Sequence, residues 1–196
     1  MINLVSDIII LLCLVALMTA ILINFAEQNR QVRKEKKSVV ETGSMTAFFI
    51  FFYLLIRFKL GHLELPETIL IILKPIGLIA IVAGTYINIR SRKTLGTNWA
   101  NQVTLYANQR LVSTGIYKYI RHPLYSSLIG MFYGACLVYP NYLAFLANTL
   151  IFLPFMYYRA KQEENLLKQS LPGYSDYIQK TGMFIPKLFR HETDTH

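Results

Sequence analysis

A short basic motif, RHPLY at residues 121–125, contains the only His-Pro pair of the chain. An apolar stretch follows directly, so Pro123 suits the first position of a helix, where its missing N–H costs nothing. The free backbone N–H groups at such a helix N-terminus attract a carboxylate. Tyr117 and Tyr125 offer rings that can stack on a planar base or lie near a cation. The motif indicates either a ligand site or a helix cap with interfacial Arg and Tyr side chains, and the residues alone leave both interpretations open.

A second group of charged residues, Arg159, Glu163 and Glu164, directly follows the last apolar stretch. Arg159 and Glu163 are four residues apart, so they share one face of a helix. One interpretation is an ion pair on a surface helix, which contributes little to stability. The other is that Arg159 binds an anion while Glu163 binds a cation. Charges at the end of an apolar stretch need a partner or a route to water, which favours the second interpretation.

Signatures of soluble enzymes are missing from this sequence, which has no GxGxxG, P-loop, GxSxG or HExxH motif. Cys13 and Cys136 lie inside apolar stretches without metal-binding spacing, and the four histidines are scattered. We therefore expect no metal. The net charge is +9, and the basic residues that produce it lie between and after the apolar stretches, where lipid head groups would be. We therefore expect no nucleic-acid partner.

The composition predicts a membrane protein, because 54% of the residues are hydrophobic and only 16% are charged, against about 25% charged in soluble domains. We expect an all-α integral membrane protein with about five transmembrane helices. The first apolar stretch is too long for a signal-peptide core and lacks a basic segment before it, so we interpret it as a retained transmembrane helix. The five stretches are 2–25, 45–60, 68–89, 124–139 and 142–158.

The second half of the chain is predicted to form a hairpin followed by a polar helix. Pro140-Asn141 marks a tight turn, and Pro154 predicts a kink in the returning helix. A polar helix is expected from Arg159, with a break at 171–173 and a short amphipathic helix at 174–180. We expect these C-terminal helices, together with the loop before the fourth apolar stretch, to form a cytoplasmic cap that binds a cofactor.

The distribution of basic residues predicts the orientation. Of the 20 Lys and Arg residues, all except Arg57, Lys59 and Lys74 lie after the first stretch, between the third and fourth, or after the fifth. With five spans these three segments share one side of the membrane, which the positive-inside rule assigns to the cytoplasm. The N-terminus is then outside, and the C-terminus and the active site are cytoplasmic.

Three sequence blocks together carry a family resemblance. They are LVSTGIYKYIRHPLY at 111–125, RAKQEENLL at 159–167, and a glycine- and tyrosine-containing stretch that ends in Ile185-Pro186. In this order they resemble the isoprenylcysteine carboxyl methyltransferase family and, more distantly, the phospholipid N-methyltransferases. The departures are Gln109, where many members have histidine, and Ser126 or Ser127, where a glycine often follows the tyrosine.

The resemblance implies an S-adenosylmethionine-dependent methyltransferase, similar to protein-S-isoprenylcysteine O-methyltransferases. Its substrate would be a lipophilic carboxylate or a lipid, and membrane lipids would surround the protein. Arg159 would bind the substrate carboxylate, and Arg159 and Glu163 would be the catalytic residues. The implied cofactor-binding residues are Gln102, Gln109, Arg110, Leu111, Val112, Tyr117, His122, Pro123, Leu124, Tyr125 and Glu163.

The chemistry separates the candidate acceptors. A carboxylate is already ionised at neutral pH, so its methylation needs positioning and desolvation but no general base. An amine must lose a proton, and His122 or Glu163 would then be the candidate base. Two alternatives therefore stay open, namely a phospholipid or other small-lipid N-methyltransferase, and a non-catalytic membrane protein that keeps the motifs for structure.

The chain is expected to have two parts. Residues 1–90 would form three N-terminal transmembrane helices. Residues 91–196 would form the methyltransferase core, made of the cofactor loop, the transmembrane hairpin 124–158 and the C-terminal amphipathic helices. The sequence names neither the acceptor nor the role of the first two transmembrane helices.

Overall fold

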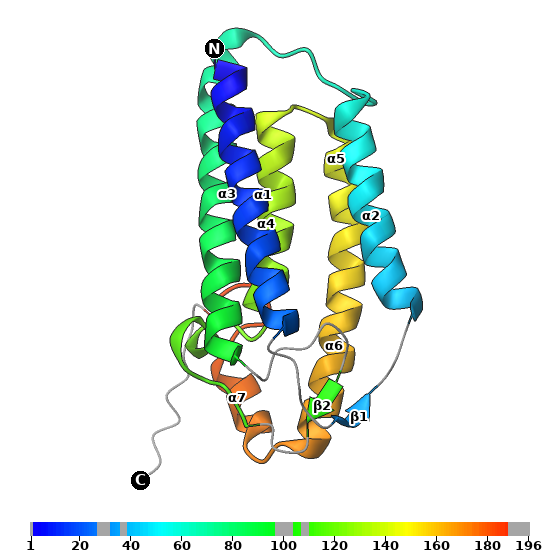
Figure 1. The fold of residues 1–196 in the computed structure, drawn as a ribbon, viewed down its shortest axis with the longest axis vertical. Helices are drawn as coiled ribbons and strands as arrows, with labels where there is room; N and C mark the ends of the chain where they lie inside the picture. The colour runs from blue at the N-terminus through cyan, green and yellow to red at the C-terminus, as the bar shows by residue number, and fades with distance from the viewer. Residues whose placement is uncertain (1, 27–31, 36–38, 97–103, 107–109, 188–196) are drawn as a thin grey trace.

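The computed structural model describes residues 2–26, 32–35, 39–96, 104–106 and 110–187. Its long helices run side by side, and two short strands and the last helix lie at one end of them (Figure 1). We call this end the site end. The helices are α1 (Ile2–Ala26), α2 (Val39–Arg57), α3 (Glu67–Leu95), η2 (Gly115–Lys118), α4 (Pro123–Val138), α5 (Tyr142–Ala147), η3 (Asn148–Phe152), α6 (Leu153–Ser170) and α7 (Tyr174–Lys180).

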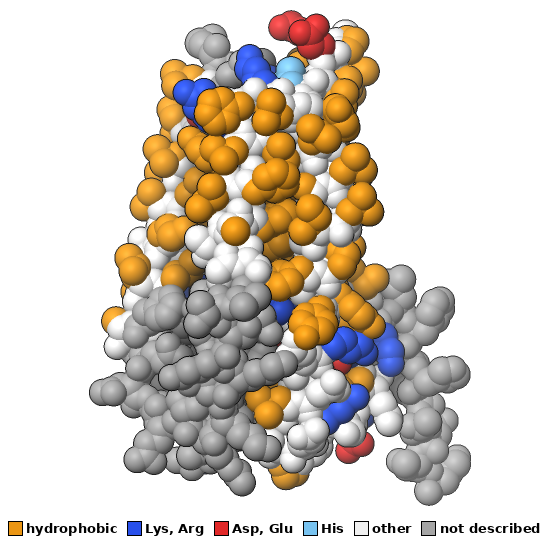
Figure 2. Space-filling view, turned by 90° about the vertical axis from the view of Figure 1, so that its right-hand side faces the viewer, with side chains coloured by type: hydrophobic (Ala, Val, Ile, Leu, Met, Phe, Trp, Pro, Cys, Tyr) orange, Lys and Arg blue, Asp and Glu red, His pale blue; other side chains and the backbone are white. Residues whose placement is uncertain are grey.

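The long helices have the length and composition of membrane spans. In α1, in α3 and in the continuous limb from α5 to α6, the helix is long and apolar enough to cross a membrane, and α2 and α4 are shorter apolar helices. Figure 2 shows hydrophobic side chains over the length of the bundle, with charged side chains towards its two ends. The predicted helical fold class is confirmed.

Two short strands were not predicted. β1 (Val32–Glu35) and β2 (Thr104–Tyr106) pair antiparallel in a two-stranded sheet. β1 lies in the basic segment after α1, and β2 lies in the segment before η2. The sheet therefore joins two segments that the sequence analysis had treated as separate loops, and it lies at the site end of the bundle (Figure 1).

Helices α3 and α4 pack closely through small residues. A Cβ atom built on Gly77 would lie 2.5 Å from the carbonyl oxygen of Gly134, and one built on Gly134 would lie 2.7 Å from that of Gly77. Such short distances require glycine on both helices, because any side chain would push the backbones apart. This contact fixes α4, and therefore the motif at its start, against α3.

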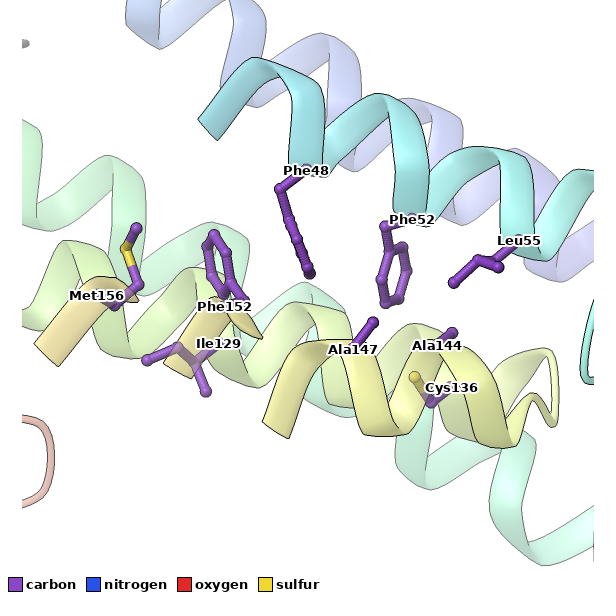
Figure 3. Packing of buried hydrophobic residues seen from close by; sticks show 9 residues of the cluster. All are labelled: Phe48, Phe52, Leu55, Ile129, Cys136, Ala144, Ala147, Phe152 and Met156. Carbon is purple, nitrogen blue, oxygen red and sulfur yellow. The ribbon is translucent and has the colours of Figure 1, made fainter. Parts of the chain in front are cut away.

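The core between α2 and the hairpin is aromatic. The rings of Phe48 and Phe152 stack with centroids 4.7 Å apart, and Phe132 meets Phe48 edge to face at 5.5 Å. Figure 3 shows Phe48 and Phe52 of α2 directed towards the returning limb of the hairpin. The sequence analysis left the role of the second span open, and the structure shows α2 as one wall of this core.

The returning limb of the hairpin contains a π-helical turn, η3, directly before α6. The sequence analysis predicted a kink at Pro154, which lies in the first turn of α6. A π-helical turn accommodates one extra residue, and one residue corresponds to about 100° of rotation around an α-helix. The π-turn therefore sets which face of α6 points towards α4. α6 then continues without a break to Ser170, so the polar helix expected after Arg159 is the end of this limb.

Candidate active site

The RHPLY motif lies at the start of α4, where Pro123 is the first helical residue as predicted. The motif is held by the segment after α7, residues 181–186, which we call the C-terminal strap. The backbone N–H of Arg121 donates to the carbonyl of Gly182 at 2.9 Å, and that of His122 donates to Met183 at 3.1 Å. These two bonds fix the direction in which the His122 side chain leaves the backbone.

The second half of α6 places two carboxylates against this motif. Tyr125 on α4 donates from its hydroxyl to Oε2 of Glu163 at 3.2 Å, across 38 residues of sequence. The two ring nitrogens of His122 face different carboxylates, with Nδ1 3.5 Å from Glu163 Oε2 and Nε2 3.3 Å from Glu164 Oε1. The rings of His122 and Tyr125 are parallel, with centroids 5.4 Å apart. The two charged motifs singled out in the sequence therefore form one cluster.

A buried ion pair anchors this cluster. Arg121 Nε donates to Glu164 Oε1 at 2.7 Å, and the two side chains are only 8% and 2% exposed. The same guanidinium donates through Nη1 to the carbonyl of Ile178 at 3.1 Å and to the carbonyl of Thr181. The sequence analysis gave neither member of this ion pair a role, although each motif places two charged residues side by side. These neighbouring charged residues were the signal in the sequence that could have pointed to the ion pair.

The charge on His122 depends on two opposing influences. Burial lowers the pKa of a histidine because it disfavours the charged form, but hydrogen bonds to Glu163 and Glu164 and the charges of these carboxylates raise it. Burial is the largest single influence, but the contributions of the two carboxylates together outweigh it, and the pKa of His122 lies above its ordinary value. The ring is thus more readily protonated than a histidine in water.

Arg159 lies inside the protein rather than on a surface helix. Its side chain is 3% exposed, and Nη1 donates to Sδ of Met45 at 3.0 Å. Its guanidinium also lies next to the Tyr125 hydroxyl. Met45 belongs to α2, so the second helix reaches the site as well as the aromatic core. The interpretation of Arg159 as half of an exposed surface ion pair is wrong.

Tyr117 contributes a buried hydroxyl to the same region. Its carbonyl accepts a hydrogen bond of 2.6 Å from the Tyr177 hydroxyl of α7. Its own hydroxyl has no hydrogen-bond partner among the residues that the structure describes. Burial and then the nearby charge of Glu163 raise the pKa of Tyr117 well above its ordinary value, so the phenol stays protonated. A buried hydroxyl of this kind is suited to a hydrogen bond with a bound polar group.

The other predicted cofactor residues are spread along the approach to α4. Arg110 is exposed, Val112 and Leu124 are half-buried, and Pro123 is buried. Leu111 is half-buried and packs against a small apolar cluster of α6 and α7, made of Leu167, Tyr174 and Tyr177. Gln102 and Gln109 lie outside the described residues, so their placement stays a prediction.

A polar chain between α3 and α4 was missed in the sequence. Arg92 Nε donates to Asn88 Oδ1 at 2.8 Å, and Asn88 Nδ2 donates to Ser127 Oγ at 2.8 Å. Ser127 in turn donates to the carbonyl of Leu124 at 2.7 Å. The signal was two polar residues four apart, near the end of an apolar stretch. This hydrogen-bonded network supports the first turn of α4 from the side of α3.

The sequence match with known proteins covers the middle of the chain. Residues 76–169 match the isoprenylcysteine carboxyl methyltransferase (ICMT) family. Two curated rice proteins, from the indica and japonica subspecies, are each described as a probable protein-S-isoprenylcysteine O-methyltransferase. Each is 29% identical over 114 residues, which are 57% of this chain and 60% of the rice protein. The chain thus spans about three fifths of the length of these relatives.

A solved structure shows a similar fold. It is the eukaryotic intramembrane Ras methyltransferase ICMT, and it matches with a TM-score of 0.56 and 25% sequence identity. The match covers 77% of this chain and 54% of that chain. The predicted family resemblance is confirmed, as is the prediction of a multi-pass integral membrane protein.

Proposed function

We propose that this chain, whose residues 76–169 match the isoprenylcysteine carboxyl methyltransferase family, is an S-adenosylmethionine-dependent methyltransferase that acts on the carboxylate of a lipid-linked, isoprenylcysteine-type substrate. The observation that carries the proposal is the contact between its two charged motifs. Tyr125 and His122 of the first motif meet Glu163 of the second within 3.2 and 3.5 Å. This contact supports a single site to which both motifs contribute.

The residues present fit the cofactor that the family implies. The bound cofactor would supply a methyl group carried on a sulfonium cation, together with an amino group and a planar base. Glu163 has the charge to pair with the amino group, and its side chain is 37% exposed. The buried hydroxyl of Tyr117 can donate a hydrogen bond to a polar group of the ligand. The remaining residues proposed for this site are Gln102, Gln109, Arg110, Leu111, Val112, His122, Pro123, Leu124 and Tyr125.

Arg159 is the proposed carboxylate-binding residue. A guanidinium binds a carboxylate through two parallel hydrogen bonds, which fixes both position and orientation. Arg159 lies in the middle of α6 and donates to Met45, which packs against the aromatic core that contains Phe48 and Phe152. A substrate with an apolar tail and a carboxylate head would place its head at Arg159 and its tail among apolar side chains. The roles of this chain's residues are therefore to bind, orient and exclude water.

We also propose that the site end faces the cytoplasm and that residues 91–196 form the methyltransferase core, with residues 1–90 as three N-terminal helices. The basic residues in the three segments at this end support the orientation. A cofactor from the aqueous phase and a substrate from the membrane could then reach Glu163 and Arg159 from different sides. The C-terminal helices and the strap would cover the cofactor side.

Binding of S-adenosylhomocysteine, the demethylated product, to protein purified in lipid nanodiscs tests the cofactor site. We expect binding in the wild type and a loss of about 100-fold in Glu163→Gln, because a charge-assisted contact is removed. Glu67→Gln, at an exposed carboxylate at the start of α3, is the matched control and should bind normally. An absence of binding by the wild type would leave the motifs with a structural role only.

Methyl transfer to an isoprenylated cysteine analogue, compared with transfer to phosphatidylethanolamine, tests the acceptor. We expect base-labile methyl ester from the first and no methylated amine from the second. Arg159→Ala should abolish the transfer while leaving S-adenosylhomocysteine binding intact, and Arg57→Ala, at an exposed arginine that ends α2, should change neither. Methylation of the amine lipid with Arg159 dispensable would contradict the proposed substrate class.

A further inference from the structure

His122 is placed between two carboxylates. Its Nδ1 lies 3.5 Å from Glu163 Oε2, and its Nε2 lies 3.3 Å from Glu164 Oε1. An ionised carboxylate only accepts hydrogen bonds, and a neutral imidazole has a single N–H. The neutral ring would therefore turn a lone pair towards one of the two carboxylates. The imidazolium form has an N–H directed at each carboxylate and a positive charge that attracts both.

Glu164 has no part in the proposed function, yet it is one of the most deeply buried charged residues in the described structure. It is 2% exposed, and Oε1 lies within 2.7 Å of Arg121 Nε and 3.3 Å of His122 Nε2. A buried charge is tolerated only with partners that offset its loss of hydration. The charged and titratable groups of this cluster, on the elements packed around His122, include Arg121, Tyr125, Arg159, Glu163 and Glu164, with Tyr117 on η2 and Tyr174 and Tyr177 on α7.

We propose that Glu164 is a positioning residue that, together with Arg121, holds His122 as an imidazolium cation bridging Glu163 and Glu164, so that Glu163 stays ionised and fixed in direction. The raised pKa of His122 agrees with this geometry. The purpose of a fixed and ionised Glu163, which is to bind the cofactor, rests on the proposed function. The charge of His122 does not depend on the proposed function.

The positive charge of His122 limits the kinds of acceptor that the site can methylate. An imidazolium has no lone pair, so His122 cannot accept a proton from an acceptor. Glu163, paired with His122 and Tyr125, is a weaker base than a free carboxylate. The site is therefore built for an acceptor that arrives without a proton to lose, such as an ionised carboxylate, and it is poorly suited to an ammonium group.

The charge of His122 can be measured directly by NMR. Replacing the other three histidines, His62, His191 and His196, with glutamine leaves His122 as the single histidine signal of a ¹⁵N-histidine-labelled protein. We expect both ring nitrogens to carry a proton at pH 7, and the ring to titrate above the ordinary value of about 6.5. A neutral ring at pH 7, with one nitrogen unprotonated, would overturn the proposal.

Two variants in that background test the role of Glu164. Glu164→Gln removes one carboxylate from the bridge, and we expect the apparent pKa of His122 to fall by about one unit. Because Glu164→Gln also leaves Arg121 buried without its partner, the double variant Arg121→Gln/Glu164→Gln, which removes both charges, keeps the test valid if the single variant does not fold. An unchanged His122 pKa in Glu164→Gln, or a His122 pKa in the double variant that is no lower than in Arg121→Gln alone, would overturn the role of Glu164. Glu67→Gln is the matched control.

A kinetic measurement separates positioning from folding. In Glu164→Gln we expect the KM for the cofactor to rise about tenfold with a smaller change in the KM for the acceptor. A purely structural role would instead lower the active fraction, and so kcat, with both KM values unchanged. If NMR shows the imidazolium but no acceptor is methylated, the charge bridge stands and the proposed function fails. Methylation of an amine that depends on deprotonated His122 would overturn the inference.

Discussion

The membrane-spanning part and the site end of this molecule are stabilised in different ways. The spanning part relies on aromatic packing such as Phe48 on Phe152 and on the close contact between Gly77 and Gly134. The site end relies on buried charges, each with a specific partner, as in the pair of Arg121 and Glu164. Apolar packing tolerates changes that keep volume, whereas a buried charge tolerates the loss of its partner poorly. Mutations in the two regions should therefore differ in kind.

The largest effect is expected where the two regions are joined. Deleting Thr149 removes one residue from the π-turn and would turn α6 by about 100° relative to α5. Glu163 would then point away from Tyr125, and we expect S-adenosylhomocysteine binding to disappear while the protein stays in the membrane fraction. The control is Thr149→Ala, which keeps the chain length and should retain binding. Full binding after the deletion would show that the π-turn does not set the direction of α6.

A core substitution in the spanning part should lower stability without changing cofactor affinity. Phe152 is fully buried, and Phe152→Ala should cost about 3 kcal/mol of unfolding free energy through the lost packing and the cavity. Thermal unfolding of detergent-purified protein measures the loss, and Leu150→Ala, whose parent side chain is 68% exposed, is the control. A large fall in the S-adenosylhomocysteine affinity of the folded fraction would contradict the claim that this core affects stability but not cofactor binding.

Part of the fold and part of the candidate site could be predicted from the sequence. The start of α4 at Pro123, the turn at Pro140-Asn141 and the helix at 174–180 were predicted, because each depends on local signals such as proline, asparagine and a break in periodicity. The two charged motifs were recognised from their residue types, and the resemblance assigned them to one site.

The π-turn, the sheet and the ion pair of Arg121 with Glu164 were not predicted. A π-turn has no sharp residue signature, because it results from how the limb packs against α2 and α4 rather than from propensity. The pairing of β1 with β2 joins segments about seventy residues apart, and its strands are too short for an alternating pattern. Which carboxylate of Glu163 and Glu164 meets Arg121 depends on the rotation of α6, which the π-turn sets.

The smallest effect is a dependence of stability on pH. The folded-state pKa of His122 lies above its ordinary value, so the folded protein binds the proton more tightly than the unfolded chain. The resulting stabilisation is fully present below about pH 6.5 and is lost as the pH rises through the folded-state pKa. We expect the difference in Tm between the wild type and His122→Gln to shrink over that range. A difference that grows with pH would mean that His122 is buried as the neutral ring.

A double-mutant cycle on S-adenosylhomocysteine binding tests the central claim, that contact between the two motifs forms the cofactor site. The cycle compares the wild type, Tyr125→Phe, Glu163→Gln and the double variant in nanodiscs. Because Tyr125 donates directly to Glu163, the two losses should be non-additive, with a coupling energy of about 1 kcal/mol. Additive losses would contradict the account, since they would mean that the two residues act on the ligand independently or that their contact is absent in the binding-competent protein.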